Sequence, residues 1–318
     1  MVRNYFKGYD RIGLSDYIVL LMYLQQITPK VENMPAPILK YLLALVASIV
    51  LTASAAASGS HGAPTYEVYA VRFATVPGFP VQYLVQGAAA NRKIDIAMTF
   101  WVLKGGGKVV LFDSGFYRDK FFKSWTVKDF VRPSEAISEL NIKPEQVTDV
   151  VISHIHWDHA DGADLFPKAH VWIQRDEYMH YIGDAWQGGR GGEGADVDDV
   201  LALVKINEAG RLNLINGDDL EILPGVRSYI GGKHTFQSQY LGVQTRQGTV
   251  VLASDNVYLF ENLEKHAPIA QTLDAKSNLK AQDRMRTLAA TPALIIPGHD
   301  PKVFVQFPKI TPRVVRID

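Results

Sequence analysis

The chain has 318 residues, of which 47% are hydrophobic, so it can form one large domain with a substantial core. Lysine plus arginine and aspartate plus glutamate each number 33, so no overall field favours binding to nucleic acid or to an anionic membrane. The absence of cysteine excludes disulfides, thiolate ligands and cysteine nucleophiles, and any metal must be bound by nitrogen and oxygen atoms.

The first predicted element is an uncharged apolar run over residues 41–57, which follows Lys40 and ends in small residues. Such a run is typical of a signal peptide, and cleavage after Ala55 or Ala57 satisfies the requirement for small side chains. We therefore expect an exported protein, periplasmic or secreted. An uncleaved membrane anchor is one alternative, because the run is near the lower limit of about 17 residues for a spanning helix. A cytosolic protein is the other.

The segment before this run is long for a signal peptide, because 33 residues precede Met34. We expect Met34 to be the true start and residues 1–33 to be an upstream extension. The predicted organisation is an N-terminal extension and signal peptide over residues 1–57, followed by one folded domain over residues 58–318.

The expected domain opens with β-rich apolar runs. Strands are predicted at residues 66–74, 79–85, 96–104, 108–115, 147–153 and 169–174. The first four are expected to be consecutive and antiparallel. A helix is expected to begin at Pro133, and another to run from Arg175 to about Ile182. Residues 183–197 are rich in glycine and charge and predict a mobile loop, with Trp186 as an apolar contact to substrate or, alternatively, a solvated linker.

The second half repeats this alternation of strands and helices. Apolar runs predict strands within residues 220–232, 240–254 and 293–297, and a helix is expected around residues 281–289. Strand blocks in both halves indicate two sheets packed face to face with helices outside. The predicted fold is therefore an α/β protein of the αββα sandwich type.

Four side chains of metal-ligand type occur within six positions directly after the buried strand 147–153: His154, His156, Asp158 and His159. In extended chain, positions i and i+2 point the same way, so His154 and His156 can hold one metal. As the chain turns into a helix, Asp158 and His159 can face a second. Without a metal, so many polar groups at a buried strand end would be unpaired.

Three further candidates, His234, Asp255 and His299, each follow an apolar strand, where loops converge on a site. With these residues the chain resembles the metallo-β-lactamase superfamily over about residues 66–318, and within it the N-acyl homoserine lactone lactonases. The resemblance implies two sets of metal ligands joined by one bridging carboxylate. They are His154, His156 and His234 for the first metal, Asp158, His159 and His299 for the second, and Asp255 as the bridge.

The same resemblance assigns supporting residues and a branch of the superfamily. It implies that Asp113 supports the site from outside the ligand set. Asp255 argues against a true β-lactamase, because those enzymes lack a bridging aspartate at this position. Tyr258, three residues later, matches a tyrosine that faces the substrate carbonyl in the lactonases, although a packed aromatic is the alternative. The segments 173–178 and 297–300 also resemble lactonase motifs.

One segment departs from the family pattern. At residues 233–239 the family has a glycine before the ligand and a Gly-His pair after it, whereas this chain has Lys233, Gln237 and Ser238. No ligand is lost, but the shape of the loop and the class of substrate are left open. The remaining histidines, His61, His170, His180 and His266, match no motif and are expected to be structural or exposed.

The implied function is a dinuclear metal-dependent hydrolase that opens a lactone ester of the acyl homoserine lactone type, a quorum-quenching reaction, by attack of a metal-bridging hydroxide. Tyr258 would stabilise the oxyanion, and Asp158 or Asp255 would carry a proton to the leaving alkoxide. Five imidazoles and two carboxylates favour two Zn²⁺ ions, although iron, manganese and cobalt are tolerated. Trp101, Phe116, Trp157 and Trp186 are candidates for an apolar acyl pocket, with a core position favoured for Trp101.

The expected partner is a small-molecule ester or lactone, with no nucleic acid and no membrane after signal removal, and a homodimer is left open. The alternative function is another hydrolase of the same fold, with an organophosphate triester, thioester or β-lactam as substrate. A non-catalytic binding protein of this fold would be expected to lose ligands, and the set of seven argues against it.

Overall fold

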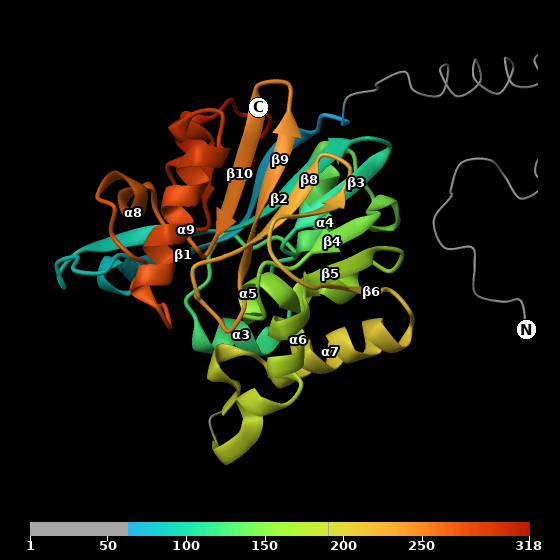
Figure 1. Cartoon of the computed structure of the whole chain (residues 1–318), viewed down its shortest axis with the longest axis horizontal. Coiled ribbons are helices and arrows are strands. Elements are labelled where there is room, and N and C mark those ends of the chain that lie inside the picture. The colour runs from blue at the N-terminus through green and yellow to red at the C-terminus, as the bar shows by residue number, and fades with distance from the viewer. Residues whose placement is uncertain (1–62, 190) are drawn as a thin grey trace, which may run out of the picture. The chain divides into compact units, whose positions relative to one another are not determined.

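Two β-sheets form the centre of the molecule (Figure 1). The computed structural model describes residues 63–189 and 191–318; the predicted signal run, Met34 and His61 lie outside them. The first sheet has the strand order β12-β1-β2-β3-β4-β5-β6. Its strands are β1 (Glu67–Pro80), β2 (Lys93–Gly105), β3 (Lys108–Phe112), β4 (Asp149–Val151), β5 (His170–Gln174), β6 (Leu212–Ile215) and β12 (Val314–Arg316).

The second sheet has five strands in the order β11-β10-β9-β8-β7. They are β7 (Leu220–Leu223), β8 (Val226–Ile230), β9 (Gln239–Thr245), β10 (Gly248–Ser254) and β11 (Ile295–Pro297). Strands β7 to β10 are antiparallel, whereas β11 pairs parallel to β10. In the first sheet β1, β2 and β3 are antiparallel as predicted, and β3 to β6 are parallel.

The predicted strand at residues 79–85 is wrong. Strand β1 instead continues to Pro80, with register shifts after Arg72 and Val76 that keep it paired with β2. It ends there because proline has no N–H to donate to a strand ladder. The following Val81–Tyr83 forms a 3₁₀ turn, η1.

The helices surround the sheets. They are α3 (Asp119–Ser124), α4 (Pro133–Ala136), α5 (Trp157–Ala160), α6 (Arg175–Tyr181), α7 (Val197–Glu208), α8 (Phe260–Glu264), α9 (Ala275–Leu288) and α10 (Val303–Gln306). Further 3₁₀ turns are η2 (Ile137–Leu140), η3 (Pro144–Gln146), η4 (Asp161–Leu165), η5 (Asp184–Gly189), η6 (Gly191–Gly194) and η7 (Pro292–Leu294). None of the helices in the described ranges is long and apolar enough to cross a membrane.

Helix α9 begins six residues before the predicted start. Its first turn is capped by Asp274, whose carboxylate accepts hydrogen bonds from the backbone N–H groups of Lys276 and Ser277 at 3.0 and 3.2 Å. Such a cap satisfies backbone donors that a helix start leaves free, so the helix extends to this residue. Helix α7 was not predicted, and the carboxylate of Asp196 caps it in the same way.

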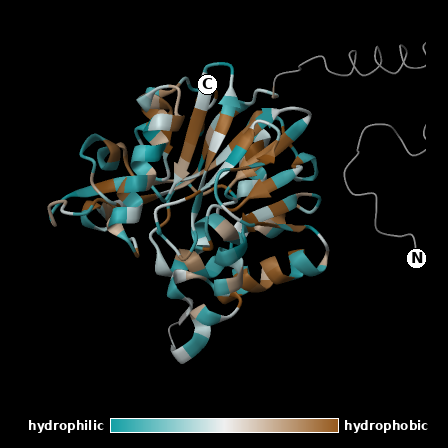
Figure 2. Cartoon of the chain, in the orientation of Figure 1, coloured by the Kyte–Doolittle hydropathy of each residue, from teal (hydrophilic) through white to brown (hydrophobic). Residues whose placement is uncertain are grey.

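Three buried clusters confirm the αββα sandwich. Trp101 and Phe112 of the first sheet pack with Leu241 and Leu252 of the second between the two sheets. On the outer faces, one cluster joins the first sheet to helices that include α6 and α7, and another joins the second sheet to α9 through Met285. Figure 2 shows hydrophobic colour concentrated on the strands and a largely hydrophilic α9. Burial of this apolar area stabilises both layers.

Strand polarity brings distant segments together. Strand β11 runs parallel to β10, with Val251 opposite Ile295 and Ser254 opposite Pro297, so the residues after both strands leave the sheet at one edge. The segment after β4 reaches the same edge, because the backbone N–H of Gln239 donates to the carbonyl of Ser153 at 2.8 Å. Loops that leave neighbouring strand ends are a common position for functional side chains.

Candidate metal centre

The seven predicted ligands meet at this edge. They form two groups whose ligand atoms lie within 4.8 Å of one another inside each group. One group contains His154, His156, His234 and Asp255, and the other contains Asp158, His159 and His299. Each follows the end of a strand, namely β4, β8, β10 or β11, in line with the sequence analysis.

Asp255 lies between the two groups and presents one oxygen to each. Its Oδ2 lies 3.3 Å from Nε2 of His234 and 3.8 Å from Nε2 of His154. Its Oδ1 lies 3.0 Å from Nε2 of His299 and 3.3 Å from Nε2 of His159. This arrangement is that of a carboxylate able to bridge two metal ions.

The hydrogen-bonding state of these atoms fits a metal site. His154 Nε2, His159 Nε2 and Asp255 Oδ1 are buried without a hydrogen-bond partner. His156 Nδ1 and His234 Nε2 lie 3.0 Å apart. Unpaired buried polar atoms are costly, and a divalent cation would satisfy all of them at once. The donor set of imidazole nitrogens and carboxylate oxygens suits zinc and related metals.

The other ring nitrogen of three ligands is fixed by a hydrogen bond. Nδ1 of His234 donates to the carbonyl of Gln271 at 2.8 Å, and Nδ1 of His299 donates to the carbonyl of Ala97 at 2.9 Å. Nδ1 of His159 donates to Oδ2 of Asp113 at 2.8 Å. Because Nδ1 is the donor in each of these bonds, Nε2 is the nitrogen that faces the centre of the cluster and would bind a metal. Asp113 therefore lies where the sequence predicted a supporting residue.

Burial and neighbouring charges set the protonation of the cluster. Burial, followed by the neighbouring His234, lowers the pKa of His156 to about 3, and burial also lowers the pKa of His154. Both imidazoles are therefore neutral, as a metal ligand must be. Burial alone would lower the pKa of His159, but the carboxylates of Asp255, Asp158 and Asp113 raise it well above its usual value.

Two glycines allow the cluster to close. A Cβ on Gly298 would lie 2.8 Å from Oδ1 of Asp255, and a Cβ on Gly194 would lie 2.7 Å from Nε2 of His156. Gly194 also has a φ of +95°, a conformation that side chains disfavour. Gly194, in the segment predicted to be a mobile loop, therefore lies directly behind a predicted ligand.

Tyr258 borders the same site. Its buried hydroxyl lies 3.4 Å from Nδ1 of His234, and its ring centroid lies 5.8 Å from that of His299. Burial, followed by the charges of Asp255 and Asp158, raises the pKa of Tyr258 well above its usual value. The phenol therefore keeps its proton at neutral pH and can donate a hydrogen bond.

A cavity of about 490 Å³ lies over the cluster. Its floor consists of His156, Asp158, His234, Asp255, Tyr258 and His299. Its walls are apolar and include Phe79, Leu84, Ile96, Met98, Trp125 and Trp157. The remaining lining comes from residues 193–194 and 270–273. The cavity thus joins a polar floor to an apolar wall, as small-molecule sites commonly do.

The four aromatic residues considered for an acyl pocket have different positions. Trp157 lines the cavity beside Trp125, with ring centroids 5.5 Å apart. Phe116 lies buried behind Trp157, and Trp101 packs on Phe112 between the sheets. Trp186 does not line the cavity, and its indole N–H donates to the carbonyl of Tyr181 at 2.5 Å. Only Trp157 of the four therefore faces the site.

The segment that departs from the family pattern is anchored by its own contacts. The ammonium of Lys233, whose φ is +59°, donates to the carbonyl of Phe236 at 2.6 Å and to Oε1 of Gln237 at 3.0 Å. The buried carboxylate of Glu177 accepts hydrogen bonds from Oγ1 of Thr235 at 2.7 Å and from the N–H of Gln237 at 2.6 Å. It also accepts one from the N–H of Ile155 at 3.0 Å. Glu177 thus ties together the loops that carry His154, His156 and His234.

The remaining described histidines lie outside the cluster. His180 stacks on Phe236 at 4.1 Å between ring centroids and lies 3.2 Å from a carboxylate oxygen of Glu193. His266 pairs with Asp283 at 2.9 Å, and His170 is exposed. These positions agree with their expected structural or exposed character.

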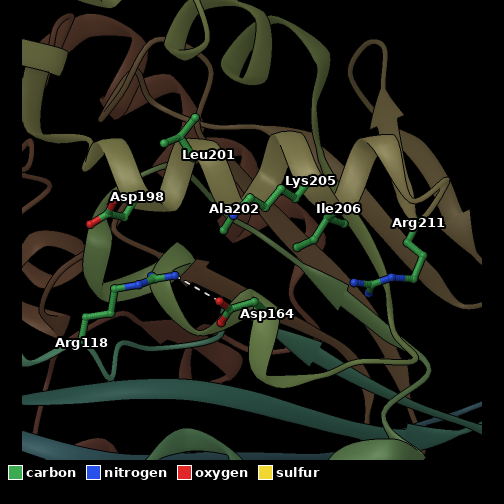
Figure 3. Close-up of a pocket in the computed structure, with 8 residues that line it drawn as sticks. All are labelled: Arg118, Asp164, Asp198, Leu201, Ala202, Lys205, Ile206 and Arg211. Atoms are coloured by element: carbon green, nitrogen blue, oxygen red, sulfur yellow. Dashed lines mark hydrogen bonds and ion pairs between the residues drawn. The ribbon is translucent and has the colours of Figure 1, made fainter.

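A second group of charged residues lies beside α7, where two of its members, Arg118 and Asp164, line another cavity of about 320 Å³ (Figure 3). The guanidinium of Arg118 pairs there with Asp164 at 3.1 Å, with Asp199 at 2.8 Å and with Asp161. Asp161 and Asp199 are buried. We refer to these four residues as the Arg118 cluster.

Comparison with known proteins decides the family. The model of the metallo-beta-lactamase superfamily matches residues 98–299, which include all seven predicted ligands and Tyr258. The chain belongs to the metallo-β-lactamase superfamily. This membership confirms the resemblance inferred from the sequence and, with it, the prediction of a metal-dependent hydrolase.

Similar proteins within the superfamily are N-acyl homoserine lactonases. The chain is 27% identical to one from Bacillus cereus over 192 residues, which cover 60% of this chain and 70% of that protein. It is 27% identical to another from Bacillus sp over 220 residues, which cover 69% of this chain and 80% of that protein.

Solved structures agree on the fold. A mutant of Bacillus thuringiensis AiiA with N-decanoyl-L-homoserine bound at its active site superposes with a TM-score of 0.63 and 20% identity, covering 79% of this chain and all of that one. AidC, described as a dizinc quorum-quenching lactonase, gives a TM-score of 0.57 and 14% identity, covering 76% of this chain and 92% of that one. At these identities the likeness establishes the architecture alone.

Proposed function

We propose that this superfamily member is a dinuclear metal-dependent lactonase, which opens the ring ester of acyl homoserine lactones or related small lactones. The observation that carries the proposal is Asp255, with one oxygen toward each group of ligands, followed three residues later by Tyr258 at the cavity floor. The similarity to N-acyl homoserine lactonases supports it.

In this proposal His154, His156 and His234 hold one metal, Asp158, His159 and His299 hold the second, and Asp255 bridges them. Zinc is the proposed metal, because it suits a nitrogen and oxygen ligand set of this kind, although iron, manganese and cobalt fit the same ligands. Two such ions, when bound, would promote ionisation of water near neutral pH and polarise an ester carbonyl.

The chain's own side chains complete the proposed reaction. The protonated phenol of Tyr258 donates a hydrogen bond to the carbonyl oxygen as negative charge develops on it. Asp158, whose side chain is partly exposed to the cavity, would accept the proton released by the attacking water and deliver it to the leaving alkoxide when the ring opens, and Asp255 is the second candidate for this step. The apolar walls hold the acyl substituent and exclude bulk water.

The described side chains around the cavity include no lysine or arginine that would pair with an anionic group of a substrate. Among the described residues that line the cavity, the charged ones are Asp158, Glu193 and Asp255. A β-lactam with a free carboxylate or a phosphodiester would meet no cationic side chain from these residues. A lactone with an apolar substituent matches both the uncharged wall and the polar floor.

The test is turnover by metal-loaded protein on short-chain and long-chain acyl homoserine lactones, beside a paraoxon-type ester and a cephalosporin. We expect lactone opening that is abolished in His156→Ala. Robust turnover of only the phosphotriester or the cephalosporin would support the alternative hydrolase class. It would contradict the lactonase but not the proposed metal centre. No turnover of any substrate by protein with two bound metals would contradict the proposal.

We further propose that the protein is exported and that its N-terminal segment is removed by cleavage after Ala55 or Ala57, a proposal supported by the apolar run at 41–57. N-terminal sequencing of protein from the periplasmic fraction or the medium tests it. The expected first residue is residue 56 or 58. Recovery of the intact segment in the membrane fraction would indicate an anchor instead.

A further inference from the structure

Four hydrogen bonds run in series beneath the two groups of ligands. Nδ1 of His154 lies 2.8 Å from Oγ of Ser153, which lies 2.9 Å from Oγ of Ser254. The hydroxyl of Ser254 donates to Oδ2 of Asp113 at 2.8 Å, and the same oxygen accepts from Nδ1 of His159. All five side chains are buried, so no bulk water competes for these bonds.

The direction of every bond follows from the ends of the series. His154 presents Nε2 to the cluster, and a metal-binding Nε2 must keep its lone pair, so the ring proton is on Nδ1 and is donated to Ser153. A hydroxyl has one proton, so Ser153 donates to Ser254. Ser254 in turn donates to the carboxylate of Asp113. The series therefore begins at a ligand of the first group and ends on a carboxylate that also holds a ligand of the second.

We propose that Ser153 and Ser254 extend the influence of Asp113 to His154, so that one carboxylate supports a ligand of each metal. The inference rests on the proposed dinuclear centre and deepens it. Ser153 and Ser254 act here as positioning residues: they fix the ring orientation and proton of His154 and polarise its Nε2 toward the metal. Asp113 contacts the ring of His159 directly and is joined to the ring of His154 through the two hydroxyls. Its other oxygen, Oδ1, accepts a hydrogen bond from the backbone N–H of Ser153 at 2.7 Å, which both serine substitutions leave in place.

The backbone of Ser254 supports a requirement for its hydroxyl. Ser254 has a φ of +47°, in the left-handed region that favours glycine. Serine is less stable than glycine in this conformation, so its presence indicates a role for the hydroxyl group. Its hydroxyl joins the side chain of Ser153 to the carboxylate of Asp113, and the next residue in the chain is the proposed bridge, Asp255.

The test measures metal binding rather than turnover. The variants Ser254→Ala, Ser153→Ala and their double variant are titrated with Zn²⁺ against a competing chelator. Crystals grown at limiting zinc give the occupancy of each group by anomalous scattering. Ser228→Ala is the matched control, because Ser228 is also buried and its hydroxyl also donates to a side chain, Oε1 of Gln239 at 2.5 Å, outside the metal centre.

We expect each single variant to weaken zinc binding at the His154 group by about 10- to 100-fold, while the His159 group and the control change by less than about 2-fold. The double variant should bind zinc as weakly as Ser153→Ala does, because loss of either hydroxyl already disconnects the ring of His154 from Asp113. Unchanged zinc binding in Ser254→Ala, or a double variant whose loss is the product of the two single losses, would overturn the proposal. If Ser254→Ala does not fold, Ser254→Gly removes the same hydroxyl and relieves the positive φ.

The outcome separates this inference from the proposed function. Wild-type protein that binds two zinc ions and shows the expected losses, yet opens no lactone, would support the serine series and contradict the lactonase. If the wild type opens lactones but both serine variants bind zinc as tightly as the wild type, the result would support the lactonase and contradict the serine series.

Discussion

The metal centre and the Arg118 cluster are both dense groups of ionisable side chains, but they neutralise charge in different ways. In the Arg118 cluster the positive charge belongs to the chain, since one guanidinium pairs with Asp164 (Figure 3) and also with Asp161 and Asp199. In the metal centre, ring nitrogens and carboxylate oxygens face one another, and several of them lack a partner.

One atom of the Arg118 cluster, Oδ2 of Asp199, also lacks a partner, and its environment accounts for it. Burial, followed by the hydrogen bond with Asp161 and its charge, raises the pKa of Asp199 to about 10, so this carboxyl keeps a proton at neutral pH. The comparison teaches that charge density alone does not mark a metal site. A candidate metal site is distinguished by buried ring nitrogens and carboxylate oxygens that face a common point, where no lysine or arginine side chain neutralises them.

The strongest test of this comparison removes the residue shared by both groups. Asp255→Ala should abolish binding of at least one metal and lower kcat/KM for a lactone by about 10⁴-fold or more, because each group loses an oxygen. Metal content by mass spectrometry and steady-state kinetics measure both effects. Asp164→Ala is the control, since it removes a carboxylate from the Arg118 cluster. Retention of two metals in Asp255→Ala would show that the bridging geometry is not used.

The second test removes the internal cation of the other region. Arg118→Met leaves the buried carboxyls of Asp161 and Asp199 without their positive partner and should destabilise the fold by about 3 to 5 kcal/mol. Urea denaturation measures the loss. Metal content below the transition should be unchanged, and a fall in metal content would show that the two regions depend on each other.

The third test concerns the tyrosine at the cavity floor. Tyr258→Phe should lower kcat by about 100-fold, since it removes one donor to the developing oxyanion, and should leave the metal content unchanged. Kinetics at saturating lactone measure the effect. A change in KM alone would indicate that Tyr258 packs against substrate without stabilising the transition state.

The smallest expected effect is a dependence on pH. A raised folded-state pKa means that Asp199 contributes full stability below its ordinary pKa of 3.8, and that this contribution falls as pH rises toward about 10. Asp199→Asn imitates the protonated form, so its free energy of unfolding should decline less with rising pH, by at most about 1.4 kcal/mol per pH unit. Unfolding curves at pH 6, 7 and 8 measure the difference. Parallel pH profiles for the variant and the wild type would contradict the assigned protonation.

The convergence of the seven candidate ligands could be predicted from the sequence because their positions follow local rules. His154, His156, Asp158 and His159 are close in the chain, and their spacing alone places them together. His234, Asp255 and His299 are far apart but share a position after an apolar strand, which is visible in the sequence. The two sheets followed from the same strand pattern.

The cavity walls could not be predicted in the same way. Phe79 lies in β1 after two shifts of register against β2, and such shifts leave no clear trace in the residue pattern. Helix α7 had a usable signal, since Asp196 can cap it and Val200 and Leu203 lie on its buried face, but the glycine-rich residues before it obscured the start. The role proposed for Ser254 depends on distances among separate segments, and an isolated serine predicts nothing.

The floor and the apolar wall of the cavity come from different parts of the chain, so substrate preference can change independently of the proposed ligands. The floor residues follow the ends of β4, β8, β10 and β11, whereas much of the apolar wall comes from β1, β2 and the segment near α3. Substitutions in one stretch can therefore reshape the space for substrate without altering the other. A combinatorial library limited to Phe79, Ile96, Met98 and Trp125 would sample new substrate preferences while retaining every proposed ligand.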